Sequence, residues 1–315
     1  MDIIFFGSSN FAVASLKALL NTAHKISCVV TQPDRKKGRG LQIAETPVKK
    51  VAIDAGLKIY QPNQVNAPEV IKFLKDLNPD LFIVVAYGQI LSGKLLDIPK
   101  IFSLNAHASL LPKYRGAAPI NWAIINGDSK TGVTIIKMIE KMDAGPLILQ
   151  KKIDISEENT SITLEDKLSN LAVQLLIDTI KSIENNDCNL TLQDETKVSF
   201  APRLKKEDGQ IDWNKPAQDI YNLIRGCLGW PDAFTYYNGK LLKIHRASVC
   251  PFARLPVCPL PGEIIKVSGE GMVVATGRDN LIIEELQIEG KRRMKTEEFI
   301  AGHKICVGEI LGIKK

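Results

Sequence analysis

The side chains of this sequence that are best suited to catalysis are an amide, an imidazole and a carboxylate. Asn105 and His107 lie two positions apart at the end of an apolar run, and Asp143 follows the next apolar run. Side chains two residues apart on a strand point to the same face, so the amide and the imidazole should share one pocket. An amide can stabilise an oxyanion, an imidazole can move a proton, and a carboxylate can orient the imidazole. The three groups suit acyl transfer to an amine.

Strand and helix patterns alternate through the first half of the chain and would place these groups at one edge of a sheet. Apolar runs predict strands at 3–6, 25–31, 80–86, 101–107 and 132–138. Helices are expected at 11–20, 119–126 and 161–185. This alternation predicts a doubly wound, Rossmann-like α/β domain with a parallel sheet. Open α/β sheets bind ligands beyond the carboxyl ends of their strands, where a neighbouring strand end could also bring Asp143 close to His107.

The last third of the chain carries short strand signals in place of long helices. Asn238-Gly239 is a strong hairpin signal between two apolar segments, and further strand-like runs continue to residue 286. This pattern predicts a small β-barrel. We expect a catalytic domain at 1–190, a polar linker at 191–206 and the barrel at 207–315.

The turn after the first strand argues against a nicotinamide cofactor. Gly7-Ser8-Ser9-Asn10-Phe11 joins a strand to a helix, where a dinucleotide enzyme carries GxGxxG. Ser9 occupies the place of the second glycine, whose missing side chain lets a pyrophosphate approach the backbone. We therefore expect an ordinary β-to-α turn and no NAD. The six cysteines form no CxxC pair, so we also expect no metal site.

Composition indicates an ordinary soluble protein with a slight excess of positive charge. The 315 residues are 45% hydrophobic and 24% charged, and the net charge of +6 permits a polyanionic partner. No apolar run approaches the roughly 18 residues of a membrane span. Scattered cysteines fit a reducing compartment. We expect a cytoplasmic monomer that does not bind a membrane.

The stretch SLNAHASLLPKYRGAAPINWAIINGD, followed by TGVTIIKMIEKMDAGPLI, resembles the folate-dependent formyltransferases. The resemblance covers almost the whole chain. It implies that the formyl donor is 10-formyltetrahydrofolate and that the second domain is an OB-like barrel. It also implies that Asn105 and His107 stabilise the oxyanion, that His107 handles the proton, and that Asp143 supports the imidazole.

The resemblance further implies a folate site beside these three groups. Two segments match it: the loop Ser109, Leu110, Leu111 and Pro112, and the strand end with Val85, Tyr87 and Gly88. The rigid, apolar loop suits one wall of a pterin pocket, and the strand end gives backbone contacts to the pterin in similar enzymes. A loop that only packs on its own sheet is the alternative interpretation of the Leu-Leu-Pro motif.

A cationic loop with two glycines follows the second strand. It resembles the insertion by which formyltransferases that act on methionyl initiator tRNA contact the acceptor end. The matching residues are Arg35, Lys36, Lys37 and Arg39. Basic residues between mobile glycines can follow phosphates and become ordered on binding. Together with the segment KEDGQIDW and the extra β domain, the loop implies methionyl initiator tRNA as the acceptor. A solvated surface loop is the alternative.

Two other functions stay open. One is a formyltransferase or hydrolase with a different acceptor: glycinamide ribonucleotide, an amine of a sugar nucleotide, or water. An enzyme for glycinamide ribonucleotide would need neither the basic loop nor the second domain. The other is an RNA-binding module that has lost catalysis. The presence of Asn105, His107 and Asp143 argues against it.

Overall fold

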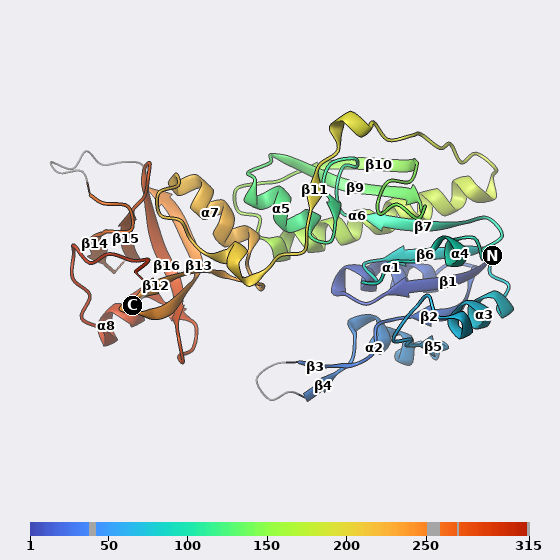
Figure 1. The fold of residues 1–315 in the computed structure, drawn as a ribbon, viewed down its shortest axis with the longest axis horizontal. Helices are drawn as coiled ribbons and strands as arrows, with labels where there is room; N and C mark the ends of the chain where they lie inside the picture. Colours follow the sequence, from blue (N-terminus) through green and yellow to red (C-terminus); the bar gives the residue numbers. More distant parts are fainter. Residues whose placement is uncertain (38–41, 251–258, 270, 314–315) are drawn as a thin grey trace. The chain divides into compact units, whose positions relative to one another are not determined.

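The computed structural model describes residues 1–37, 42–250, 259–269 and 271–313 (Figure 1). The chain divides into two compact units. The first contains residues 1–119, 130–154 and 164–202, and the second contains residues 120–129, 155–163 and the chain from 203 on. Among the described residues, no helix combines the length and the apolar character that crossing a bilayer requires.

A seven-stranded sheet in the order β10-β9-β7-β6-β1-β2-β5 organises the first unit. Its strands are β1 (Asp2–Gly7), β2 (Lys25–Val30), β5 (Ile59–Tyr60), β6 (Leu81–Val85), β7 (Phe102–His107), β9 (Lys130–Lys137) and β10 (Leu147–Asp154). From β7 to β5 all neighbours are parallel, which confirms the doubly wound α/β fold. The expectation of a parallel sheet was wrong for β9 and β10, which run antiparallel to their neighbours. A short loop joins these two strands, and only an antiparallel pair can be joined so directly.

Helices cover both faces of the parallel strands. They are α1 (Asn10–Leu20), α2 (Pro47–Asp54), α3 (Pro68–Asp76), α4 (Gly93–Leu96) and α6 (Ser161–Glu184), the last belonging to this unit from residue 164 on. Ile4 and Phe6 of β1 pack with Leu74 of α3 in one core cluster. Ile3 and Phe5 alternate to the opposite face and are also fully buried. Each such side chain contributes about 1.5–3 kcal/mol of burial free energy, which makes the strand ends rigid supports for a site.

Three short elements of the first unit lie outside the main sheet. They are the hairpin of β3 (Arg35–Lys37) and β4 (Gln42–Ala44), the parallel pair of β8 (Arg115–Gly116) and β11 (Phe200–Ala201), and the 3-10 helix η1 (Glu195–Lys197). The polar segment expected as a linker thus carries β11 and η1, and up to Pro202 it belongs to the first unit.

An antiparallel sheet in the order β12-β13-β16-β15-β14 forms most of the second unit, with β17 on β16. The strands are β12 (Ala233–Tyr237), β13 (Lys240–Cys250), β14 (Ile264–Ser268), β15 (Gly271–Ala275), β16 (Asn280–Ile288) and β17 (Met294–Lys295). The helices are α5 (Pro119–Ile125), η2 (Lys206–Gly209), α7 (Ala217–Gly226) and α8 (Thr296–Gly302).

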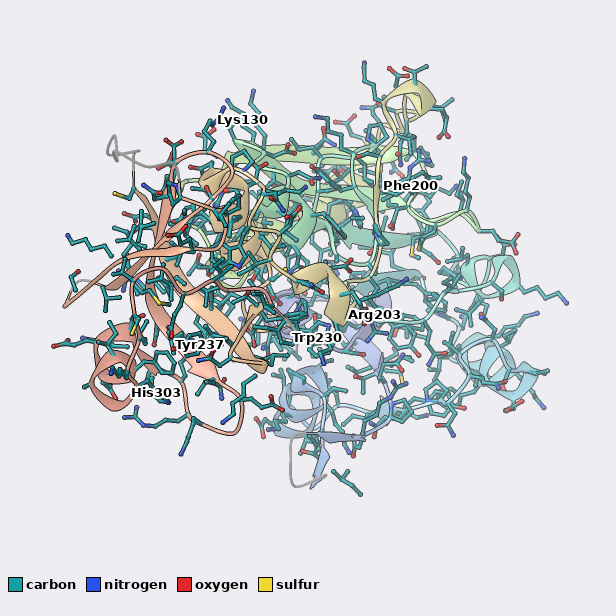
Figure 2. All side chains as sticks on the ribbon, turned by 60° about the vertical axis from the view of Figure 1, so that its left-hand side comes forward. Lys130, Phe200, Arg203, Trp230, Tyr237 and His303 are labelled. Atoms are coloured by element: carbon teal, nitrogen blue, oxygen red, sulfur yellow. The ribbon has the colours of Figure 1, made fainter. Side chains whose placement is uncertain are left out.

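Turn and terminal contacts shape this second sheet. The hairpin between β12 and β13 has φ values of 50° at Asn238 and 78° at Gly239, as its sequence predicted. The segment after residue 308 bridges the two edge strands, because Leu311 N donates to Gly262 O and Gly312 N donates to Tyr236 O. Helix α8 packs on the sheet, where the ring of Phe299 stacks on His303 and meets Tyr237 edge-on. Tyr237 and His303 are labelled in Figure 2.

Candidate active site

The structure brings Asn105, His107 and Asp143 together at the end of β7. Asn105 Nδ2 donates a hydrogen bond of 3.2 Å to Asp143 Oδ1. His107 Nδ1 lies 3.6 Å from Asp143 Oδ2, and only 7% of the His107 side chain and 11% of the Asp143 side chain are exposed. The amide, the imidazole and the carboxylate therefore share one largely desolvated place, where each hydrogen bond is stronger than in water.

Asp143 reaches this place by a route that differs from the expected one. Because β9 is antiparallel to β7, its last residue Lys137 pairs with Leu104, away from His107. The loop that follows β9 runs back towards His107, so the end of β9 itself does not point at the imidazole. At the base of the loop Lys137 N donates to Pro146 O, and Asp143 itself takes a left-handed φ of 52°. The position of the Asp143 carboxylate is therefore set by a tightly folded loop and not by the direction of a strand.

The backbone around His107 determines its tautomer. Nε2 of His107 lies 2.9 Å from Tyr114 O. A carbonyl oxygen can only accept, so we assign the hydrogen of the neutral ring to Nε2. Nδ1 then carries a lone pair and can accept a proton. Once it has done so, Asp143 stabilises the imidazolium.

The carboxylate of Asp143 is itself held from two sides. Gly116 N donates to Oδ2 at 2.9 Å, while Asn105 donates to Oδ1. Gly116 has a φ of 131° and lies against β11, where an added Cβ would come within 2.5 Å of Ala201 O. Only glycine fits this close approach, and the pairing of β8 with β11 thereby aims the amide at Asp143.

Three polar residues near the site were missed from the sequence. The guanidinium of Arg115 is 1% exposed and binds both Gln193 and Glu195. Gln193 in turn contacts the main chain of the Asp143 loop. Segment 191–206 has the composition expected of a linker, and no local signal in it or around Arg115 marks this contact.

The predicted folate loop is firmly built into the first unit. Ser109 is buried, and its hydroxyl donates to Lys113 O at 2.6 Å. The hydroxyl of Thr134 donates to Ser109 O and accepts from Leu111 N. Leu111 is also buried, so its side chain packs inward. Leu110 and Pro112 are half-buried, and theirs are the side chains of this motif that remain available to a ligand.

The second predicted folate segment lies next to β7, since Val84 of β6 pairs with Asn105 of β7. The side chains of Val85 and Tyr87 are both buried. Burial raises the pKa of Tyr87, whose ring packs edge-on against Phe6 with centroids 5.5 Å apart. Gly88 is exposed. Any contact of this segment with a pterin would therefore involve its main chain.

Part of the predicted tRNA loop lies outside the described residues. Arg39 is among these, and of Lys36 and Lys37 only the main chain in β3 is described. Arg35 is exposed, and its guanidinium donates to Gln32 Oε1 at 3.3 Å. At the base of the loop Lys49 is paired with Asp34 and Glu45, which anchors the two ends of the hairpin to each other.

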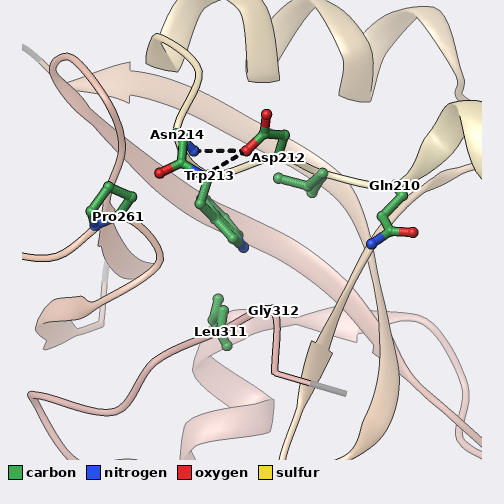
Figure 3. Close-up of a pocket in the computed structure, with 8 residues that line it drawn as sticks. Gln210, Asp212, Trp213, Asn214, Pro261, Leu311 and Gly312 are labelled. Atoms are coloured by element: carbon green, nitrogen blue, oxygen red, sulfur yellow. Dashed lines mark hydrogen bonds between the residues drawn. The ribbon is translucent and has the colours of Figure 1, made fainter.

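A cavity of about 420 Å³ lies elsewhere, in the second unit (Figure 3). Its lining residues include Gln210, Asp212, Trp213, Asn214 and Pro261. Hydrogen bonds from Asn214 lower the pKa of Asp212, which keeps this carboxylate ionised. None of the predicted site residues lines this cavity.

Comparison with known proteins gives full-length matches. Residues 1–180 match the family model of formyl transferases, and residues 203–304 match that of the formyl transferase C-terminal domain. The methionyl-tRNA formyltransferase of Acetivibrio thermocellus is 44% identical over 312 residues, covering 99% of this chain and 100% of the relative. That of Citrifermentans bemidjiense is 43% identical over 314 residues, covering 100% and 97%.

Solved structures share the fold at lower identity. An N-formyltransferase from Helicobacter canadensis, solved with folinic acid and dTDP-3-aminofucose, superposes with a TM-score of 0.67 at 20% identity, covering 89% of this chain and 98% of that one. HypX from Aquifex aeolicus gives a TM-score of 0.65 at 16% identity, covering 96% of this chain and 47% of that one. The two family models and the full-length relatives show that the chain belongs to the formyltransferase family, among the methionyl-tRNA formyltransferases.

Proposed function

We propose that this chain transfers the formyl group of 10-formyltetrahydrofolate to the α-amino group of methionyl initiator tRNA. The observation that carries the proposal is the close grouping of Asn105, His107 and Asp143 in a chain that matches methionyl-tRNA formyltransferases over its whole length. The product would be formylmethionyl-tRNA, which serves translation initiation. The formyl donor is a co-substrate, and the role of each residue follows from its geometry.

Asn105 is the first group to act on the formyl oxygen. When the amine nitrogen adds to the formyl carbon, a C–N bond forms and the carbonyl electron pair moves to oxygen. One hydrogen of Asn105 Nδ2 is bound to Asp143 Oδ1, and the other can donate to this oxyanion. Removing one such donor typically slows turnover by about 10²–10³-fold.

His107 handles the proton. Addition makes the amine nitrogen cationic, and His107 Nδ1, which carries the lone pair, accepts its proton. The imidazolium is stabilised by Asp143 and can then donate from Nδ1. The oxyanion collapses to the new amide carbonyl, the bond from carbon to N10 of the folate breaks, and N10 receives the proton. Neutral His107 has no hydrogen on Nδ1, so it helps to hold the oxyanion only after it has taken up this proton.

We assign residues 1–190 to catalysis and residues 207–315 to tRNA binding, with 191–206 connecting them. The cofactor-binding residues are Ser109, Leu110, Leu111, Pro112, Val85, Tyr87 and Gly88. The basic loop with Arg35, Lys36, Lys37 and Arg39 is assigned to the acceptor end of the tRNA. Its charges would attract phosphates, as would the net charge of +6. The enzyme would act as a cytoplasmic monomer without a membrane partner.

The alternative acceptors are an amine of a sugar nucleotide and glycinamide ribonucleotide. Full-length relatives at 43–44% identity carry the tRNA activity in their names, whereas the sugar-modifying structure is only 20% identical. The test supplies 10-formyltetrahydrofolate with each acceptor separately, and with uncharged initiator tRNA as the control that lacks an amine. We expect formyl transfer to methionyl initiator tRNA alone. Transfer to a small acceptor and none to the charged tRNA would reject the proposal.

A further inference from the structure

We propose that Gln193 is a positioning residue for Asp143. Its side-chain amide would hold the loop that carries Asp143 at the place from which the carboxylate reaches His107. The proposal rests on the proposed formyl transfer. It gives segment 191–206, which was expected to be a linker, a role in positioning a catalytic group.

Two hydrogen bonds connect Gln193 directly to the main chain of the catalytic loop. Gln193 Nε2 donates to Asp143 O at 2.8 Å and to Gly145 O at 2.7 Å. Both hydrogens of the amide are thereby used. The tip of the loop is exposed at residues 139–142, and its ion pair between Lys141 and Glu195 is also exposed to solvent, so this pair holds the loop only weakly. Asp143 also has a left-handed φ of 52°, a conformation that surrounding contacts must maintain.

The other end of the Gln193 amide is fixed by a buried cation. Gln193 Oε1 accepts from Arg115 Nε at 3.1 Å and from Nη2 at 2.7 Å. A buried guanidinium remains charged and needs acceptors, and Glu195 supplies another at 2.7 Å. This ion pair holds the pKa of Glu195 down at about 2. Oxygen must face Arg115 and nitrogen must face the two carbonyls, so the Gln193 amide has one satisfied orientation.

Three consecutive residues, Tyr114, Arg115 and Gly116, hold His107 and Asp143 in place. Tyr114 O binds the ring of His107, Gly116 N binds the carboxylate of Asp143, and Arg115 holds the Asp143 main chain through Gln193. The carboxylate and its backbone are therefore tied to the same short segment that sets the tautomer of His107.

Loss of the two Gln193 donors should allow the main chain of Asp143 and Gly145 to move. The carboxylate would then lie farther, on average, from His107 Nδ1, which is 3.6 Å away in the intact site. A displacement of about 1 Å can slow a reaction by about 10²-fold. The residues that we assign to folate and tRNA do not include this loop, so the loss should appear in kcat and leave both KM values nearly unchanged.

The decisive variant is Gln193→Glu. It keeps the shape of the side chain and the acceptor for Arg115, but it has no hydrogens to donate and repels the two carbonyls. We expect kcat for formyl transfer to fall by about 10²-fold. Leu192→Ala is the control, since that side chain is 84% exposed and should tolerate the change.

A second measurement does not depend on the acceptor. In histidine-labelled full-length protein, the NMR signals of the His107 ring should change position in Gln193→Glu relative to the wild type, with the thermal midpoint nearly unchanged. Wild-type turnover in Gln193→Glu, or unchanged His107 ring signals, would overturn the positioning role. A kcat loss that comes only with a lowered thermal midpoint would show a merely structural role. Wild-type protein that does not formylate methionyl initiator tRNA would instead reject the proposed function, while the NMR comparison still decides on Gln193.

Discussion

The Nε2 atom of His107 lies 2.9 Å from the carbonyl oxygen of Tyr114, and this contact decides which ring nitrogen is left to accept a proton. The acceptor keeps the hydrogen on Nε2, so Nδ1 is the basic atom. Nδ1 also faces the carboxylate of Asp143. A base with a carboxylate beside it is stabilised in its protonated form, which is the form that the reaction creates.

Two replacements of His107 test separately the hydrogen bond of its ring to Tyr114 O and the basicity of Nδ1. His107→Gln can still donate to Tyr114 O but offers no basic nitrogen, whereas His107→Ala does neither. We expect both variants to lose about 10²–10⁴-fold in kcat. Only the alanine variant loses the hydrogen bond to Tyr114 O, and we expect it to be less stable than the glutamine variant by about 1 kcal/mol in a denaturant titration. Near-normal turnover of His107→Gln would refute the role of Nδ1.

Replacing Asp143 tests the carboxylate itself. Both of its oxygens accept a hydrogen bond, from Asn105 and from Gly116. In Asp143→Asn one acceptor becomes a donor that faces another donor, and the negative charge is lost. We expect a lower kcat, measured in the formyl-transfer assay with methionyl initiator tRNA. Wild-type kcat in Asp143→Asn would mean that the carboxylate is not needed for the reaction.

The basic loop gives a prediction about tRNA alone. Arg39→Ala should reduce kcat/KM for methionyl initiator tRNA by about tenfold or more, as expected when a charge-assisted hydrogen bond of ~1.5–3 kcal/mol is lost. The slope of log affinity against log salt should fall by about 0.7–0.9 for one phosphate contact. Arg39→Lys is the matched control, because it keeps the charge and should keep the salt slope. An unchanged kcat/KM in Arg39→Ala would remove the loop from tRNA recognition.

Much of the site geometry can be predicted from the sequence, but only where all the residues concerned lie on a single strand or helix. Asn105 and His107 share a face because of the two-residue period of one strand, and the apolar run before them identifies that strand. The position of Asp143 depends on the antiparallel direction of β9 and on a left-handed residue in a loop. Apolar patterning does not encode strand direction, so the proximity of Asp143 was expected for a reason that does not hold.

Contacts between distant segments could not be predicted from the sequence, for a different reason. Gln193 meets the main chain of Asp143 across 50 positions, and Arg115 lies 78 positions from Gln193. Polar residues in a loop look alike whether they face water or a buried guanidinium. Segment 191–206 has the composition of a linker, yet it carries the residues that support the carboxylate.

His245 in the second unit shows the same difficulty on a smaller scale. It lies between Lys243 and Arg246 in the sequence, where a surface residue would be expected, but its side chain is only 7% exposed. Burial lowers the pKa of His245, and Asp232, with its carboxylate 3.7 Å from the ring, only partly opposes this effect. Arg293 and Lys243 act in the same direction as burial.

This burial predicts how stability depends on pH. The unfolded chain takes up a proton on His245 near pH 6.5, while the folded protein does so only at lower pH. Since the unfolded state then binds more protons, the free energy of unfolding should fall as the pH drops below about 6.5, until the folded pKa is reached. His245→Phe removes the titrating group and keeps a ring of similar shape. We expect a flatter decline of the thermal midpoint between about pH 7 and pH 5 in this variant. An equally steep decline in both proteins would mean that His245 takes up its proton as readily in the folded state as in the unfolded one.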